Sequence, residues 1–101
     1  MPSEHLLDAA YQLAKNAHTA NAHVDAKEKL QGMYPTSPWN EILDAYLKGC
    51  ELAEKCYEIA DTARRERIPD QMALQTLVDR FPGFSARTYN YALTLGWFLS
   101  R

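Results

Sequence analysis

Residues 37–67, SPWNEILDAYLKGCELAEKCYEIADTARRER, decide the fold. Ser37 and Pro38 are typical of a helix N-terminus, and Glu41 follows in the first turn, where an acid opposes the positive helix end. From there apolar residues recur at alternating steps of four and three, the period of one helix face. This seam comprises Trp39, Leu43, Tyr46, Cys50, Ala53, Tyr57 and Ala60. The stretch therefore predicts one long helix that ends near Arg67.

The residues before this helix show the same period. Ser3 precedes an apolar series with helical spacing, so we predict a first helix from about Ser3 to Leu30. The Asn, His and Thr residues between Asn16 and Asn21 are indifferent helix formers, which leaves open whether this helix is continuous. Gly32 and the Met-Tyr-Pro-Thr segment after it end the helix. Two long helices joined by so short a loop are expected to pack as an antiparallel hairpin.

Beyond residue 67 the predicted helices are shorter. Ile68-Pro69-Asp70 interrupts the long helix, a short helix ends at Pro82-Gly83, and Ser85 caps a last helix. Ala and Leu are abundant whereas Val and Ile are scarce, so local preference favours helix throughout. We therefore predict an all-α fold, a small helical bundle with a long antiparallel helical hairpin followed by two shorter helices. We expect a single helical domain over residues 1–101, without an internal repeat.

The charge balance limits the classes of partner. The net charge is −2, so no overall field attracts nucleic acid or anionic lipid. All five lysines lie in residues 1–60 and all six arginines lie in residues 61–101, which makes the chain acidic first and mildly basic later. No apolar run approaches the roughly 20 residues that cross a bilayer, and the first residues lack the pattern of a secretory signal. We expect a cytoplasmic protein that does not bind a membrane.

Side chains able to catalyse a reaction or hold a metal do not gather in this sequence. Cys50 and Cys56 are too far apart on one helix for a disulfide, so we expect two buried free thiols. His18 and His23 lack the i, i+4 spacing by which two imidazoles reach one ion. The sequence contains no nucleophile motif and no glycine-rich phosphate loop. We therefore expect no metal, no cofactor and no enzymatic activity.

An acidic stripe runs along the long helix, and its members are Glu51, Glu54, Glu58 and Asp61. The spacing is similar to the Glu-x-x-Glu and Glu-x-x-Asp pairs of all-α nucleotide pyrophosphohydrolases, and the resemblance implies magnesium-dependent catalysis. In that family the pairs come from separate helices, whereas here they share one helix and do not converge on an ion. Lys48, Lys55 and Arg65 follow Asp44, Glu51 and Asp61 by four residues. This pattern favours a solvated face with ion pairs, and the magnesium enzyme is a third hypothesis.

The C-terminal segment resembles the second half of a helix-turn-helix regulator. A short helix, the Phe81-Pro82-Gly83-Phe84 turn and a helix capped by Ser85 carry the resemblance. The residues that it assigns to DNA are Arg87, Thr88 and Asn90, with Arg80 available for phosphates. The last helix has one cation in its first three turns, whereas recognition helices normally present several groups to DNA. The alternative function is therefore a DNA-binding regulator that acts through residues 70–95.

The last helix is apolar over more than half of its circumference, whereas a surface helix in a small bundle has an apolar stripe about 100° wide. Either this helix is the central element of the bundle, or another molecule covers part of it. The candidate partner-binding residues are Tyr91, Trp97, Phe98, Tyr34 and Trp39, because aromatic side chains are enriched at binding hot spots. We expect a small non-enzymatic protein–protein interaction module, such as a regulator, inhibitor or immunity-type factor. It would bind another protein or form a homodimer.

Overall fold

The computed structural model describes residues 3–99, which form helices and the connections between them. The helices are α1 (Glu4–Ala14), α2 (Ala20–Met33), α3 (Trp39–Arg65), α4 (Asp70–Arg80) and α5 (Ala86–Leu99). No strand occurs among the described residues, so the predicted all-α fold is confirmed. Within the same part of the chain, no helix combines the length and the apolar character that crossing a membrane requires.

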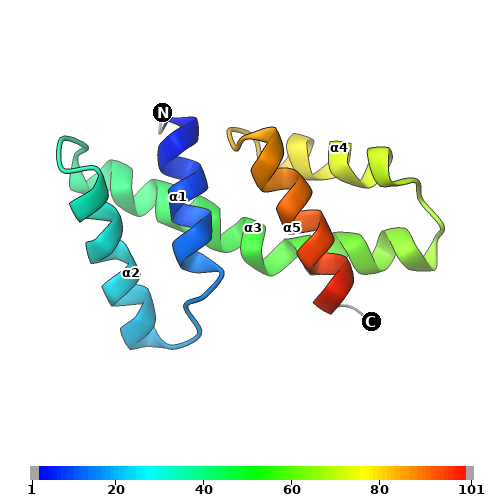
Figure 1. Cartoon of the computed structure of the whole chain (residues 1–101), viewed down its shortest axis with the longest axis horizontal. Coiled ribbons are helices and arrows are strands. Elements are labelled where there is room, and N and C mark those ends of the chain that lie inside the picture. The colour runs from blue at the N-terminus through cyan, green and yellow to red at the C-terminus, as the bar shows by residue number, and fades with distance from the viewer. Residues whose placement is uncertain (1–2, 100–101) are drawn as a thin grey trace.

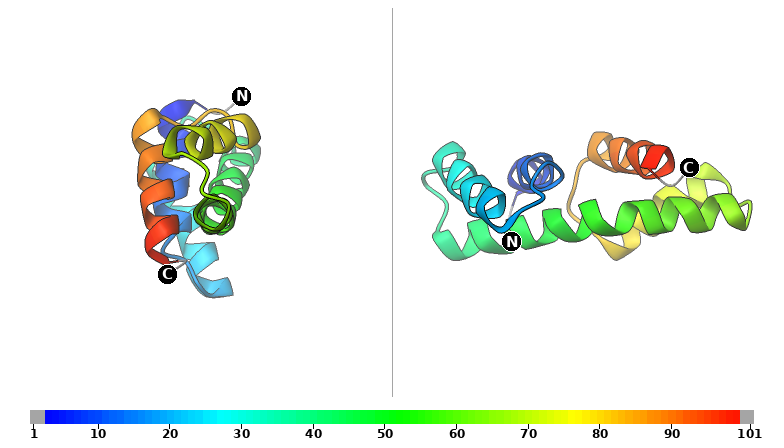
Figure 2. Two further views of the ribbon diagram at one scale, coloured as in Figure 1. Left: turned by 90° about the vertical axis from the view of Figure 1, so that its right-hand side faces the viewer. Right: turned by 90° about the horizontal axis from the view of Figure 1, so that it is seen from below.

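The longest helix, α3, runs along the whole length of the molecule, which measures 43 × 26 × 16 Å (Figure 1). Helices α1, α2 and α5 cross one side of α3, and α4 returns beside its C-terminal half (Figure 2). Every other helix packs against α3. As a result, α3 is the scaffold of the small bundle, with α1, α2 and α5 on one side of it and α4 beside its C-terminal half (Figure 2).

The first part of the chain differs from the prediction of one helix over residues 3–30. Helices α1 and α2 are separated by residues 15–19, so the prediction of a single helix there is wrong. Thr19 is the reason, because its Oγ1 accepts the backbone N–H of Ala22 at 3.1 Å and its backbone is extended. A residue that caps a helix in this way cannot continue the helix before it. In place of one hairpin arm, two short helices cross α3 (Figure 1).

The buried face of α3 is rotated from the predicted seam. Its buried residues are Ile42, Ala45, Tyr46, Gly49, Leu52, Cys56, Ile59, Ala60 and Ala63. Trp39, Leu43 and Tyr57, which belong to the predicted seam, are exposed instead. Gly49 accounts for the rotation, because a Cβ there would lie 2.8 Å from the backbone of Ala10. Helix α1 therefore crosses α3 in backbone contact at this glycine, and the large apolar residues point away from the core.

The structure contains an internal repeat, contrary to the expectation from the sequence. Residues 34–38 join α2 to α3, and residues 81–85 join α4 to α5, so the two connections have the same length. Tyr34 and Phe81 begin them with nearly identical φ/ψ angles of −129°/65° and −131°/67°. Each donates its backbone N–H to the carbonyl of the leucine four residues earlier, and each is followed by proline.

The helices around the two connections match as well. Equivalent residues are buried in both copies, as the pairs Ala26 and Ala73, Leu30 and Leu77, Ala45 and Ala92, and Gly49 and Gly96 show. A Cβ on Gly96 would lie 2.7 Å from the carbonyl oxygen of Cys56, which repeats the contact between Gly49 and Ala10. We call α1, α2 and the N-terminal half of α3 the first unit. The second unit consists of the C-terminal half of α3, α4 and α5, so both units share α3.

Candidate functional site

The five residues predicted to bind a partner lie in two separate parts of the molecule. Tyr34 and Trp39 lie near the connection between α2 and α3, at one end of the molecule. Tyr91, Trp97 and Phe98 lie on α5, in the other half (Figure 1). Tyr34 packs against the core, whereas Trp39 is exposed. These residues therefore do not form a single surface.

Packing accounts for much of the apolar breadth of α5. Its core side carries Tyr89, Ala92 and Leu93, which are buried, and Trp97, which is partly buried against the same core. Tyr91 is exposed, and its hydroxyl accepts a hydrogen bond of 2.8 Å from Nζ of Lys15 on α1. Phe98 is exposed as well. Helix α5 is therefore chiefly a core element, and two large apolar side chains extend outward from its described part.

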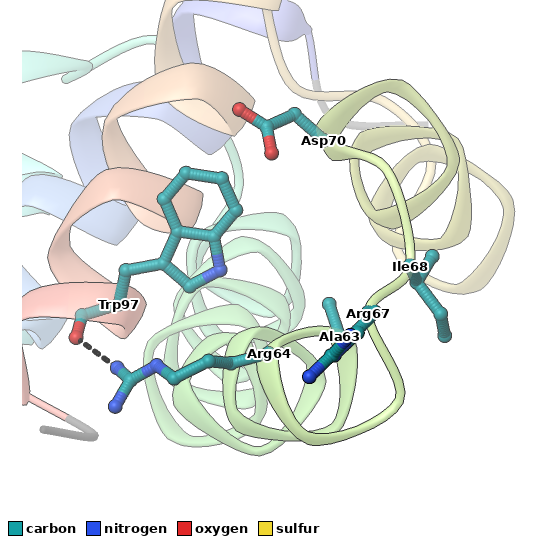
Figure 3. A pocket seen from close by; sticks show the side chains of 6 residues that line it. All are labelled: Ala63, Arg64, Arg67, Ile68, Asp70 and Trp97. Carbon is teal, nitrogen blue, oxygen red and sulfur yellow. Dashed lines mark hydrogen bonds between the residues drawn. The ribbon is translucent and has the colours of Figure 1, made fainter.

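Trp97 extends from α5 into the space between α3 and α4, where it lines a cavity of about 600 Å³ (Figure 3). Arg64, Arg67 and Asp70 also line this cavity, and Nη2 of Arg64 donates to the carbonyl oxygen of Trp97 at 2.7 Å. Two guanidinium groups beside one carboxylate give the cavity mixed charge. The residues that line it include no pair of nucleophile and base, so the cavity does not define a reaction or a ligand class.

The second unit contains the short helix, the connection and the capped helix on which the helix-turn-helix resemblance rests. Helix α5 crosses α4 steeply after the connection 81–85 (Figure 1). Ser85 caps α5, because its Oγ accepts the backbone N–H of Thr88 at 3.2 Å. The Tyr89 hydroxyl accepts the N–H of Phe84 at 3.2 Å and donates to the carbonyl of Phe81. These bonds fix the turn relative to α5.

The residues assigned to DNA differ in their exposure. Arg87 and Asn90 on α5 are exposed, as is Arg80 at the end of α4. Thr88 is only 3% exposed, and its Oγ1 lies 3.3 Å from Oγ of Ser85. Thr88 is therefore part of the cap of α5 and cannot face DNA, which corrects its predicted role. The outward positions of α5 also include Thr94, and the helix carries no acidic residue.

The histidines and cysteines do not converge. Among residues 3–99, no three His, Cys, Asp or Glu side chains are placed to hold a metal ion. Nδ1 of His23 lies 2.6 Å from the Tyr46 hydroxyl, so this imidazole has a partner within the fold. Cys56 is buried, whereas Cys50 is half-buried, and both are free thiols. Burial raises the pKa of Cys56 to about 11 and also raises the pKa of Cys50, so both thiols are protonated and weakly nucleophilic at neutral pH.

The outward face of α3 emerges only from the structure. Trp39, Leu43 and Leu47 lie one turn apart on it and are 48%, 37% and 59% exposed, and we call them the apolar stripe. Beyond Leu47 the same face carries the exposed carboxylates of Glu51, Glu54 and Glu58. From here on the acidic stripe means these three residues, without Asp61. At a rise of 1.5 Å per residue, the two stripes together extend for about 30 Å along the helix. The signal in the sequence is Gly49, because a glycine inside a helix often marks a close backbone approach and so identifies the core side.

The internal repeat shows that the fold does not require large apolar residues at the apolar stripe. The equivalent positions in the second unit are Ala86, Asn90 and Thr94, which are also exposed. A helix in the same place and with the same glycine contact therefore accepts small or polar side chains on its outward face. The three neighbouring exposed apolar side chains of the stripe therefore exceed what the fold requires, and exposed apolar patches mark interaction sites.

The charges beside the apolar stripe are only partly neutralised. The ion pairs on α3 are Lys48–Asp44 at 3.2 Å, Lys55–Glu58 at 3.5 Å and Arg65–Asp61 at 3.1 Å. The predicted pairs at Asp44 and Asp61 are confirmed, whereas Lys55 pairs with Glu58 and not with Glu51. Within the described part of the chain, Glu51 and Glu54 have no ion-pair partner. Because exposed pairs of this kind contribute about 0–1 kcal/mol, a partner is able to exchange them at little cost.

Comparison with known proteins adds no relative. No family model, no curated protein and no solved structure matches the chain.

Proposed function

We propose that this protein is a non-enzymatic interaction module that binds another protein through the apolar stripe of α3. The observation that supports the proposal is the difference between the two units at equivalent positions. Where the second unit has Ala86, Asn90 and Thr94, the first unit has Trp39, Leu43 and Leu47 on the same outward face. The fold accepts either set, so the apolar set is best explained by a molecule that covers it.

The energy available from this contact suits a protein interface. Full burial of a large apolar side chain contributes about 1.5–3 kcal/mol, and roughly half of each side chain of the stripe is still exposed. Covering all three therefore contributes on the order of 3 kcal/mol, which is the scale of a binding hot spot. Trp39 is the residue type most enriched in such sites, and its place at one end of the stripe provides an anchor.

Leu47→Asp is expected to weaken the complex more than 100-fold and to leave the fold intact, because the substitution places a carboxylate on an exposed position in the centre of the interface. A photoreactive benzoylphenylalanine at position 43, in cells of the source organism, provides the measurement. It should give one cross-linked product of defined mass, whose protein is identified by mass spectrometry, and Leu47→Asp should abolish that product.

Met72→Asp is the matched control, because Met72 lies on α4 and is 60% exposed, almost the same as Leu47 at 59%. It should leave the cross-linked product unchanged. Equal loss in both variants, or a product that persists in Leu47→Asp, contradicts binding through the apolar stripe.

A second candidate function is DNA binding through α5, and the capped helix-turn-helix arrangement of the second unit favours it. Arg87, Asn90 and Thr94 form a line of exposed side chains on α5, a helix without acidic residues. Lys15 lies next to this line, because its Nζ donates to the hydroxyl of Tyr91 on the same helix. Arg87 and Asn90 are residue types that read base edges, and Lys15 has the charge that phosphates attract. The acidic stripe lies on α3 and not on α5, so the two candidate sites are distinct surfaces.

Under this candidate, light scattering of the full chain with duplex DNA at low salt should show a complex that dissociates as salt rises. Arg87→Ala should weaken that complex by about tenfold, on the scale of about 1–3 kcal/mol for a base contact. Arg65→Ala is the control, since Arg65 is an exposed arginine paired with Asp61 on α3. Absence of a complex, or the same loss in both variants, removes DNA recognition by α5.

A further inference from the structure

We propose that the occupant of the outward face of α3 is one amphipathic helix of a different protein, apolar toward one end and basic toward the other. It lies lengthwise along α3, with its apolar part on Trp39, Leu43 and Leu47 and its basic part on Glu51, Glu54 and Glu58. This inference rests on the proposed function and specifies the partner. The juxtaposition of the two stripes on one continuous helix face carries it.

Charge complementarity identifies the basic end of the partner. Glu51 and Glu54 are exposed carboxylates without an ion-pair partner in the described chain, and they continue the face immediately after Leu47. A helix that covers the apolar stripe and extends further along α3 meets these carboxylates, and lysine or arginine there gains attraction that an uncharged residue does not. The same carboxylates repel nucleic acid and anionic lipid, which excludes both as occupants of this face.

A second copy of this chain does not fit the face. In a parallel pair of α3 helices, Glu51 and Glu54 of one copy would lie beside the same carboxylates of the other. In an antiparallel pair over the full face, the acidic stripe of each copy would cover the apolar stripe of its partner and leave apolar residues opposite charges. An antiparallel pair limited to the apolar stripes buries only three large side chains from each copy. Each arrangement is poorer than a helix with the complementary order of apolar and basic residues.

The dimensions specify the length of the partner helix. The face extends for about 30 Å, which corresponds to about 20 residues of α-helix. Figure 2 shows that α1, α2 and α5 lie on the other side of α3. Helix α4 flanks the C-terminal part of the face, where Arg80 lines one pocket with Glu51 and another with Glu58, so the partner helix has to approach from the side away from α4. Recognition of this kind uses apolar anchors one turn apart on the partner helix, facing the residues of the stripe.

Two synthetic helical peptides of about 20 residues test the inference with the full chain. The block peptide carries three leucines one turn apart, followed by three lysines one turn apart on the same face. The alternating peptide has the same composition, with leucine and lysine in alternating order along that face. Fluorescence anisotropy of the labelled peptides should show that the block peptide binds at least tenfold more tightly and that its affinity falls with salt.

Glu51→Lys with Glu54→Lys should weaken the block peptide at least tenfold, and Leu47→Asp should weaken it as well. The control with the same change in net charge is Asp25→Lys with Glu28→Lys, two exposed acids of α2, which should weaken the peptide far less. Equal binding of both peptides, or equal effects of the two charge-reversal variants, overturns the inference.

The failure of this inference is distinguishable from failure of the proposed function. If neither peptide binds and the cross-link from position 43 still depends on Leu47, the basic helix is wrong and the interaction module stands. If the cross-linked product is a second copy of the chain, the occupant is this protein itself and the inference is also wrong. If the cross-link does not depend on Leu47, both proposals fail.

Discussion

Gly49→Ala and Gly96→Ala are each expected to lower the free energy of unfolding by about 3 kcal/mol, at the upper end of the cost of overpacking. A Cβ would lie 2.8 Å from the backbone of Ala10 in the first case and 2.7 Å from the carbonyl oxygen of Cys56 in the second. Backbone atoms cannot rotate away as the end of a side chain does, so two helices must separate. Urea unfolding followed by circular dichroism measures both losses.

Gly32→Ala provides the opposite control for this prediction. Gly32 lies in α2, and a Cβ there would meet nothing within 4 Å. Alanine loses less backbone freedom than glycine on forming a helix, so this variant should gain up to about 1 kcal/mol. If Gly49→Ala or Gly96→Ala also gains stability, the helices do not cross at these glycines and the repeat loses its main structural support.

The sequence was sufficient to predict where most helices begin and end. Pro38, Pro69 and Pro82 lie at the boundaries that the structure shows, because proline cannot continue a helix in which the N–H is needed. The end of the first helix was harder to place. Thr19 is an ordinary residue in a helix interior and a good N-cap, and only the docking of α2 against the bundle decides between the two.

The orientation of α3 was not predictable from the period of its apolar residues. Two overlapping series have helical spacing, the predicted seam that begins at Trp39 and Leu43 and a second one through Ile42, Gly49 and Leu52, and a periodic pattern does not say which one is buried. The backbone contact at Gly49 selects the core side. Trp39 and Leu43 of the predicted seam are left outside and belong to the candidate binding site, so the error in the predicted seam and the discovery of the apolar stripe have the same origin.

The repeat was hidden for a related reason. The two units share few identical residues beyond Pro35 and Pro82 and the buried pairs such as Leu30 and Leu77, because exposed positions have diverged. The buried positions keep the residues that the packing of the helices requires, whereas the exposed positions accept side chains of different chemistry. The sites that distinguish the units are therefore the positions at which the repeat is least visible in the sequence.

Leu30→Ala and Leu77→Ala are each expected to lower the free energy of unfolding by about 2–5 kcal/mol, the range for deletion of a fully buried leucine side chain. Both leucines are 0% exposed and lie at equivalent positions in the two units, one before each connection. The two losses should therefore be similar. Val24→Ala, at an exposed position of α2, is the control and should change the stability by less than about 0.5 kcal/mol.

The same two variants also show whether the units unfold together. Trp39 lies in the first unit and Trp97 in the second, so Trp97→Phe and Trp39→Phe backgrounds make fluorescence report on one unit at a time. Because α3 is continuous through both units, loss of either unit removes packing from half of it, and we expect coincident urea transitions for both tryptophans even when only Leu30 or Leu77 is replaced. If Leu77→Ala shifts the transition of Trp97 and leaves that of Trp39 unchanged, the units fold independently, and each behaves as a domain with its own binding surface.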